Sequence, residues 1–238
     1  MTFRLKRRAA PRSWTVPRKG TKWLLRPRPG PHAQDRSIPL LLVLRDLQHV
    51  VASSREARLL VRSGAVQVDA KVAQDLARGI GLMDTVSLAA PLDRHFRLVT
   101  DRRGKLVLVA IPSTEAAVKV ARVRAKHAVR GGKVEVTLHD GRNLLVDATT
   151  PWRVGDSVKI ELPKQNVLEH LALKPGVLAY LAGGSHVGEL GRVERVEVRN
   201  SPQPNLVHFK EGFSTIKEYV FVVGDQAPAV TLGEGVDR

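Results

Sequence analysis

The stretch that decides the fold is residues 54–88, SREARLLVRSGAVQVDAKVAQDLARGIGLMDTVSL. At about 100° per residue, a helix over residues 55–63 would place Arg55, Arg58 and Arg62 on one face and its apolar side chains on the opposite face. The pattern therefore predicts a helix that is packed on one side and cationic on the other. It is equally typical of an ordinary surface helix whose charged face is only solvated.

The residues that follow predict a small hairpin and a further strand. Gly64 is expected to end the helix, and residues 66–68 alternate between apolar and polar as a strand does. Asp69-Ala70 reads as a tight turn before Lys71, and a second alternating run covers residues 85–88. Helix, hairpin and strand together would hold the three guanidinium groups and Lys71 on one surface.

Regular elements are also predicted on either side of this stretch. Upstream, Ser37 could cap a helix over residues 39–51 that turns its leucines inward and Arg45 and His49 outward. Ser53-Ser54 would cap the arginine-bearing helix. Downstream, residues 96–99 and 105–111 predict a hairpin.

The first 34 residues predict an extended basic arm. They contain ten Lys or Arg residues, no Asp or Glu, and prolines that interrupt any helical or strand period. Such a segment cannot bury enough apolar area to fold alone. Trp14 and Trp23 lie among the bases, where each could stack on an unpaired nucleobase for about 1–3 kcal/mol. The alternative is that they fasten the arm to the protein's own surface.

Residues 116–223 predict a β-rich region of small barrels or sandwiches. The expected strands are 118–124, 133–138, 143–146, 157–162, 177–182, 191–198, 206–209 and 216–223, with one helical turn at 167–172. The segment from Lys174 is crowded with glycine, and its loop carries Ser185 and His186 ahead of Arg192. We expect it to form a compact RNA-contacting module. After Gly224 the chain predicts a loose tail.

Composition narrows the classes of protein. The net charge of +16 and the pI near 10.9 favour a polyanionic partner. The longest uninterrupted apolar run, residues 40–44, falls far short of the ~20 residues of a membrane helix, so we expect no membrane partner. Prolines break the basic N-terminus where a signal peptide would need an apolar segment. With no Cys, disulfides, thiolate catalysis and the usual structural zinc sites are excluded.

Motifs that would carry catalysis or bind a cofactor are missing from the sequence. Neither GxxxxGK[ST] nor GxGxxG occurs, and no two histidines are spaced i, i+4. His139 and Asp140 fit a turn between strands, and no partner nucleophile is identifiable by spacing. These patterns therefore indicate no catalytic residue and no metal site, although they do not exclude an enzyme.

Several stretches together resemble the archaeal and eukaryotic type of small-subunit ribosomal protein four. The arm segments APRSWTVPRKGTKW and RPRPGPH are the most specific. Residues 55–88 resemble a small RNA-binding domain shared by ribosomal proteins, tRNA synthetases and pseudouridine synthases, and the segment from Lys174 looks like a KOW motif. GGKVEVTLHDGRNLLV and FSTIKEYVFVVG are also similar to the family, so the resemblance covers about residues 3–224.

The resemblance implies a structural constituent of the small ribosomal subunit, located in the cytoplasm, with no enzymatic activity, no cofactor and no small-molecule substrate. Its partners would be small-subunit rRNA and neighbouring ribosomal proteins. The candidate RNA-binding residues from charge, position and resemblance are Arg4, Lys6, Arg7, Arg8, Arg12, Trp14, Arg18, Lys19, Lys22, Trp23, Arg26, Arg28, Arg45, Arg55, Arg58, Arg62, Lys71, Ser185, His186, Gly188 and Arg192. The chain departs from the family pattern at Ala70, where glycine is common, and at Ser54, where a second arginine often stands.

The expected fold class is α+β, in five parts. These are an extended basic arm (1–36), an RNA-binding domain of helix plus hairpin (37–112), a β-rich central domain (113–173), a KOW or SH3-like small β-barrel with C-terminal strands (174–224) and a flexible tail (225–238).

Two other functions remain open from the sequence. One is an RNA-modifying enzyme such as a pseudouridine synthase, although DGRN at residues 140–143 has the wrong order for that family's GRLD-like motif. The other is a KOW-containing transcription or translation factor, which would leave the basic arm without a purpose.

Overall fold

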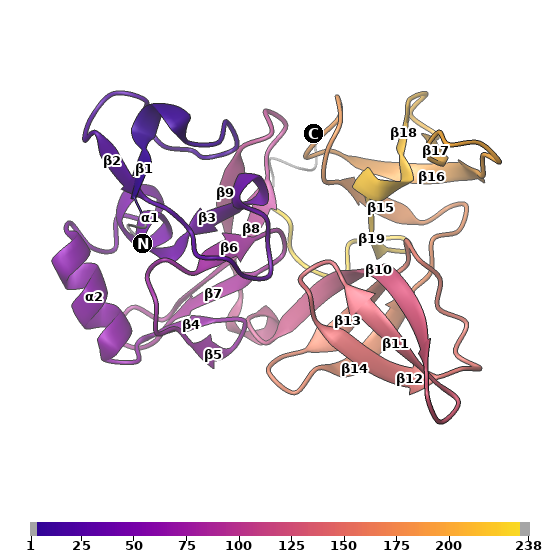
Figure 1. Cartoon of the computed structure of the whole chain (residues 1–238), viewed down its shortest axis with the longest axis horizontal. Helices are drawn as coiled ribbons and strands as arrows, with labels where there is room; N and C mark the ends of the chain where they lie inside the picture. The colour runs from indigo at the N-terminus through magenta and orange to yellow at the C-terminus, as the bar shows by residue number, and fades with distance from the viewer. Residues whose placement is uncertain (1–3, 234–238) are drawn as a thin grey trace. The chain divides into compact units, whose positions relative to one another are not determined.

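The structure is a computed structural model that describes residues 4–233 (Figure 1). The chain forms two compact units, residues 4–100 with 104–117 and residues 101–103 with 118–233. It is rich in antiparallel strands and has few helices. The predicted α+β class therefore overstated the helical content. Within the described residues, α-helix is confined to α1 (Leu40–Leu42) and α2 (Ser54–Arg62).

A five-stranded antiparallel sheet of order β5-β4-β7-β8-β9 forms the centre of the first unit. Its strands are β4 (Val66–Val68), β5 (Lys71–Val72), β7 (Thr85–Leu88), β8 (Arg94–Thr100) and β9 (Leu106–Ile111). The strand predictions here are correct to within two residues at each end. β7 is buried along its whole length. A separate pair, β3 (Ser37–Pro39) and β6 (Gly79–Gly81), runs antiparallel beside it.

Helix α2 begins and ends where local chemistry predicts. The Ser53 hydroxyl accepts a hydrogen bond from the Glu56 N–H at 3.2 Å, and the Glu56 carboxylate accepts one from the Ala52 N–H at 2.9 Å. This arrangement is a variant of the capping box: the Ser53 hydroxyl satisfies an N–H group of the first turn, and the Glu56 carboxylate binds the N–H of the residue before the cap. At the other end Gly64 takes a φ of +78°, a left-handed conformation that stops the helix.

The turn between β4 and β5 is left-handed at both central residues. Asp69 has a φ of +54° and Ala70 a φ of +57°, as a two-residue hairpin of this kind requires. An alanine in that region costs about 1 kcal/mol relative to the permissive glycine. The Asp69 carboxylate offsets part of this cost by accepting a hydrogen bond from the Thr85 N–H at 3.1 Å.

The prediction of a helix over residues 39–51 capped by Ser37 is wrong: the helix is shorter, and Ser37 does not cap it. Ser37 and Pro39 are paired with β6, so the helix cannot begin before Leu40. α1 then passes into a π-helical turn, η3 (Val43–Leu47), and the chain leaves it at Gln48. All five residues 40–44 are buried, because this segment runs through the core instead of along its surface.

The basic arm folds onto the first unit, which corrects the expectation that it stands apart from the protein. β1 (Arg4–Lys6) pairs with β2 (Trp23–Leu25), and the indigo N-terminal segment lies near α1 and β3 in Figure 1. Trp14 and Leu24 belong to the same buried core as Leu40 and Leu42 of α1. The composition of the arm excludes folding alone, but a core supplied by the rest of the unit removes that restriction.

Specific hydrogen bonds fix the arm in place. Trp14 Nε1 donates to the Ser37 carbonyl at 2.7 Å, and the Leu106 N–H donates to the Ser13 carbonyl at 2.7 Å. His32 Nε2 lies 3.1 Å from the buried Asp84 carboxylate. The arm is therefore an ordered part of the first unit.

The second unit contains two five-stranded antiparallel sheets that share no strand. The first has the order β12-β11-β10-β13-β14 and the second the order β18-β17-β16-β15-β19. Their strands are β10 (Val118–Val129), β11 (Lys133–Leu138), β12 (Asn143–Asp147), β13 (Ser157–Glu161), β14 (Asn166–Leu171), β15 (Leu178–Leu181), β16 (Leu190–Glu197), β17 (Leu206–Phe209), β18 (Ser214–Ile216) and β19 (Val220–Gly224).

Two predictions in the second unit are wrong. Residues 167–172 form most of β14 instead of a helical turn, because they pair with β13 and short apolar runs do not distinguish the two structures. The strand expected at 216–223 is interrupted by a 3₁₀ turn, η5 (Lys217–Tyr219), so that its two halves pair with different strands. β10 also runs five residues further than predicted, to Val129.

Candidate nucleic-acid interface

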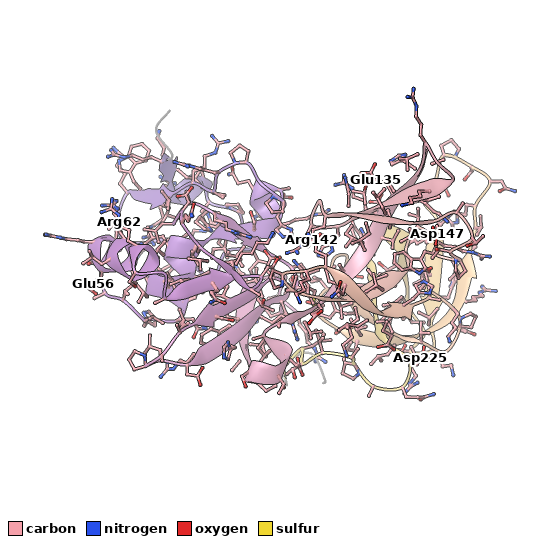
Figure 2. The ribbon with its side chains drawn as sticks, turned by 90° about the horizontal axis from the view of Figure 1, so that it is seen from below. Glu56, Arg62, Glu135, Arg142, Asp147 and Asp225 are labelled. Atoms are coloured by element: carbon pink, nitrogen blue, oxygen red, sulfur yellow. The ribbon has the colours of Figure 1, made fainter. Side chains whose placement is uncertain are left out.

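Helix α2 presents three arginines away from the core. Ala57 and Val61 are buried, while Arg55, Arg58 and Arg62 on the other side are all exposed. No hydrogen bond or ion pair joins these three guanidinium groups to another residue in the described part of the chain. Figure 2 shows Arg62 and Glu56 projecting outward from the same helix. The predicted division of the helix into a packed and a cationic face is confirmed.

Arg55 does not stabilise helix α2. Hydrogen bonds from the Ala52 N–H and the Ser53 hydroxyl lower the pKa of Glu56 and keep a negative charge in the first turn. A carboxylate there is favoured by the helix dipole, whereas the cation of Arg55 in the same turn is disfavoured. Arg55 thus opposes the local electrostatics of its helix, which points to a role outside the fold.

Most of the basic side chains of the arm remain at the surface although its backbone is packed. Those exposed are Arg4, Lys6, Arg8, Arg12, Arg18, Lys19, Lys22, Arg26 and Arg28. Some have partners within the unit: Arg28 lies 3.1 Å from Asp75, and Arg26 donates to Gln34 at 3.1 Å. Lys71 on β5 is exposed as well. The arm and α2 therefore add their cations to the surface of one unit.

Arg7 differs from the rest of the arm. Its guanidinium donates to the carbonyls of Thr21 at 2.7 Å and Pro17 at 2.6 Å. A third bond joins it to the Thr21 hydroxyl at 2.9 Å. These bonds close a loop of the arm, so Arg7 is a structural residue as well as a candidate for RNA binding.

The two tryptophans of the arm have different surroundings. Trp14 is 2% exposed, so neither face of its ring is open to a nucleobase, and the prediction that it stacks on RNA is wrong. It instead fastens the arm to the protein, as the alternative interpretation held. Trp23 is 42% exposed, and Lys22 Nζ lies 5.6 Å from the centre of its ring. Trp23 thus keeps the exposure that base stacking needs.

Arg45 is half-buried instead of facing outward. Its guanidinium donates to both carboxylate oxygens of Asp46, at 3.1 and 2.8 Å, and to the Ser54 hydroxyl at 3.0 Å. With its charge matched in this way, Arg45 differs from the three arginines of α2. Its partners lie close in sequence, but a sequence pattern does not show which way the side chain turns.

The predicted residues of the Gly-rich loop are placed unequally. Ser185 is exposed, whereas Gly188 is buried and its backbone is closed to a partner. The His186 ring stacks on Phe213 with centroids 4.2 Å apart and lies 3.1 Å from the Glu189 carboxylate. Arg192 donates to the side chain and the carbonyl of Gln226, both at 3.2 Å. Within the loop, Ser185 and the edge of His186 remain the accessible candidates.

Sequence reasoning missed a cationic hairpin in the second unit. The exposed side chains here are Arg124 on β10, Lys133 on β11 and Arg130 in the turn with Gly131-Gly132. Residues 116–134 contain six Lys or Arg and no acid, which is the same signal that marked the arm. The alternating strand pattern accounts for these residues as part of a sheet, so it does not by itself indicate a binding surface.

Two family models match this chain. The model described as ribosomal family S4e matches residues 92–167, and the one described as the RS4NT (NUC023) domain matches residues 1–35. Small ribosomal subunit protein eS4 of Methanothermobacter thermautotrophicus is 37% identical over 97% of this chain and 96% of its own length. The chain belongs to ribosomal family S4e.

Further S4e proteins agree with this assignment. The eS4 protein of Methanocella arvoryzae is 39% identical over 95% of this chain and 96% of its own. A crystal structure of the 30S ribosomal protein S4e from Thermoplasma acidophilum matches with a TM-score of 0.71 and 33% identity, covering 80% of this chain and 96% of that one. No helix in residues 4–233 is long and apolar enough to cross a membrane.

Proposed function

We propose that this S4e protein is a structural constituent of the small ribosomal subunit that binds folded rRNA mainly through phosphate and shape contacts. S4e is a family of ribosomal proteins and not of enzymes. The pseudouridine synthase alternative is therefore dropped. The cytoplasmic location follows from a place in the ribosome, where the partners would be rRNA and adjacent ribosomal proteins.

The observation that carries the proposal is the cationic face of α2. Three exposed guanidinium groups lie on one capped helix and form no ion pair within the described residues, and one of them opposes the helix dipole. Guanidinium groups bind phosphate oxygens through paired hydrogen bonds, and a folded helix sets their spacing in advance. The exposed cations of the arm and Lys71 would extend this surface over the same unit.

The finer domain division is part of the proposal. We assign residues 37–112, with the arm packed on them, to the RNA-binding domain, and residues 113–173 to the central domain. We assign residues 174–224 to a KOW or SH3-like barrel, because their sheet shares no strand with the sheet before it. Ser185 and His186 would face RNA from its loop. The flexible tail expected from residue 225 is wrong for residues 225–233, because Val230 and Leu232 are buried and the Ala229 N–H donates to the Val223 carbonyl at 2.7 Å, while residues 234–238 lie outside the described residues.

Replacement of Arg55, Arg58 and Arg62 together by Gln tests the proposal. Each lost phosphate contact lowers the slope of log affinity against log salt by about 0.7–0.9, so we expect a loss of about two to three for the triple variant. The melting temperature should stay close to that of the wild type, because all three side chains are exposed. Both quantities are measured with small-subunit rRNA of the same organism and by thermal unfolding.

Arg199→Gln is a suitable control. The Arg199 guanidinium already donates to Glu197 at 2.8 Å and to Gln203 at 3.0 Å, so its removal should leave the salt slope unchanged. A triple variant that binds rRNA with the wild-type slope would contradict the role of α2. A protein found mostly away from ribosomes in a sedimentation gradient would favour the transcription or translation factor instead.

A further inference from the structure

The positive charge of the second unit is concentrated in one hairpin. Residues 118–134 contain six Lys or Arg and no Asp or Glu, whereas residues 135–233 contain ten Lys or Arg and twelve Asp or Glu. The basic segment comprises β10, the turn after it and the first two residues of β11. The rest of the unit is therefore close to neutral, and its excess of cations lies in this β10–β11 hairpin.

Three of the six cations are engaged within the protein. Lys119 is completely buried, and its Nζ lies 2.9 Å from the Asp140 carboxylate. The Arg122 guanidinium donates to a backbone carbonyl of η5. Lys126 Nζ donates to two carbonyls of the loop between β12 and β13, at 3.4 and 3.1 Å. These three side chains hold β10 to the rest of the unit.

The other three cations, Arg124, Arg130 and Lys133, are exposed. No hydrogen bond or ion pair joins their side chains to another residue among residues 4–233. The nearest acids in the sheet register are Asp147, which is opposite Lys133 on β12, and Glu135, two residues further along β11 (both labelled in Figure 2). Neither forms an ion pair with these cations, so the hairpin presents three positive charges that the described protein does not match.

The hairpin extends beyond the strand on its other side. Residues 118–122 of β10 pair with β13, whereas residues 125–129 pair with β11. All of residues 127–133 are exposed, and Figure 1 shows their turn at the lower edge of the second unit, away from β16 to β18. Strands that project beyond a core gain little stability from burial. The projecting end therefore adds little to folding and stays open to a partner.

The backbone places the free cations along this projecting end. Arg124 lies at the register shift of β10, where a bulge turns a side chain out of the regular alternation. Arg130 and Lys133 flank Gly131-Gly132, whose φ values are +80° and +67°, and a Cβ atom at either glycine would meet no atom within 4 Å. A bare turn lets a phosphate group approach the backbone N–H groups closely.

We propose that Arg124, Arg130 and Lys133 form a second phosphate-binding surface for the rRNA backbone, carried by the β10–β11 hairpin of the second unit. Guanidinium and ammonium groups that lack a carboxylate partner bind phosphate oxygens through charge-assisted hydrogen bonds. From Arg124 to Arg130 the strand spans about 20 Å at about 3.3 Å per residue, so the surface reaches more than one phosphate. The inference rests on the proposed function, because it assigns the same RNA as the ligand.

Replacement of Arg124, Arg130 and Lys133 together by Gln tests this surface. We expect the slope of log affinity for small-subunit rRNA against log salt to fall by about two to three, since each lost phosphate contact lowers it by about 0.7–0.9. Arg130→Gln and Lys133→Gln without the third change should account for about 1.5 of this loss. The melting temperature should stay close to that of the wild type, because the three side chains are exposed and join no ion pair within the described residues.

Lys164→Gln is the matched control. Lys164 lies in the turn between β13 and β14 of the same sheet, is exposed, and has no ion-pair partner in the described part of the chain. It should leave the salt slope unchanged. A loss of about 0.7–0.9 at Lys164 as well would show that any surface cation of this unit contributes equally, and it would overturn a site localised on the hairpin.

Two variants separate this inference from the proposed function. If the triple variant of α2 lowers the slope and the triple variant of the hairpin does not, the hairpin site is wrong while the proposed function stands. Losses that add when both sets of substitutions are combined would support two independent surfaces. A fall in melting temperature of several degrees with an unchanged slope would assign the hairpin cations to the fold and overturn the inference. If the wild type does not bind rRNA, both proposals fail.

Discussion

Asp140 holds its negative charge inside the second unit, where only 5% of the residue is exposed. Its Oδ2 lies 2.9 Å from Nζ of Lys119, whose side chain is completely buried, and 2.9 Å from Nε of Arg142. Burial alone would raise the pKa of Asp140, but Lys119, His139 and Arg142 outweigh it and lower that pKa to about 2. The buried Asp140–Lys119 ion pair depends on both partners, since either charge left alone would be costly to bury.

The lowered pKa of Asp140 predicts a specific loss of stability in acid. Because the folded pKa lies below the unfolded value of 3.8, the contribution is present above that pH and is lost as the pH falls towards 2. It amounts to about 2 kcal/mol. The unfolding free energy of Asp140→Asn should therefore fall less than that of the wild type between about pH 5 and pH 2. Chemical denaturation across this range measures the difference, and equal acid sensitivity of the two proteins would contradict it.

The arm is the element for which the structure differs most from the sequence-based prediction. Trp14 packs in the core of the first unit, and its Nε1 donates to the Ser37 carbonyl, whereas Trp23 stands 42% exposed on β2. Deletion of the arm, an obvious test of its charges, would also remove Trp14 and Leu24 from that core. Its role in RNA binding must be tested through its surface cations.

Replacement of each tryptophan by alanine separates packing from exposure. Trp14→Ala should destabilise the first unit by about 3–5 kcal/mol, as the loss of a buried aromatic side chain does. Trp23→Ala should change the unfolding free energy by less than about 1 kcal/mol, because much of its ring is already in water. Denaturant unfolding of both variants measures this. Near-equal losses would show that the arm is not held by Trp14.

Elements specified by neighbouring residues could be predicted from the sequence. The Ser53 cap, the stop at Gly64 and the turn at Asp69-Ala70 all depend on interactions within a few residues, and the structure has each of them. The arm could not be placed in this way, because its partners, such as Leu106, lie far along the chain. Its composition excludes folding alone but says nothing about a core that another segment supplies.

Some features of the candidate site could likewise be predicted from the sequence, and others could not. Helical periodicity was enough to predict which face of α2 is cationic. It could not show that Arg192 is occupied by Gln226 or that Gly188 is buried, because those facts depend on segments that meet only in the folded chain.

Across the whole molecule, a few cationic side chains are buried and paired, and many more are exposed. Arg97 and Lys119 are fully buried and serve the fold, paired with Glu115 and Asp140. The exposed cations of the arm and α2 contribute little to stability, since surface charges rarely do. They are available for a polyanion, and a protein built this way should bind rRNA with a strong dependence on salt.

The affinity for small-subunit rRNA as a function of salt tests this central claim most directly. The decisive comparison is between the wild type and a variant in which Arg8, Arg12, Lys19, Arg55, Arg58 and Arg62 are replaced by Gln, with Trp14 left in place. The account predicts that the slope of log affinity against log salt falls by about four to five while the melting temperature is retained. A folded variant that binds rRNA with the wild-type slope would contradict it.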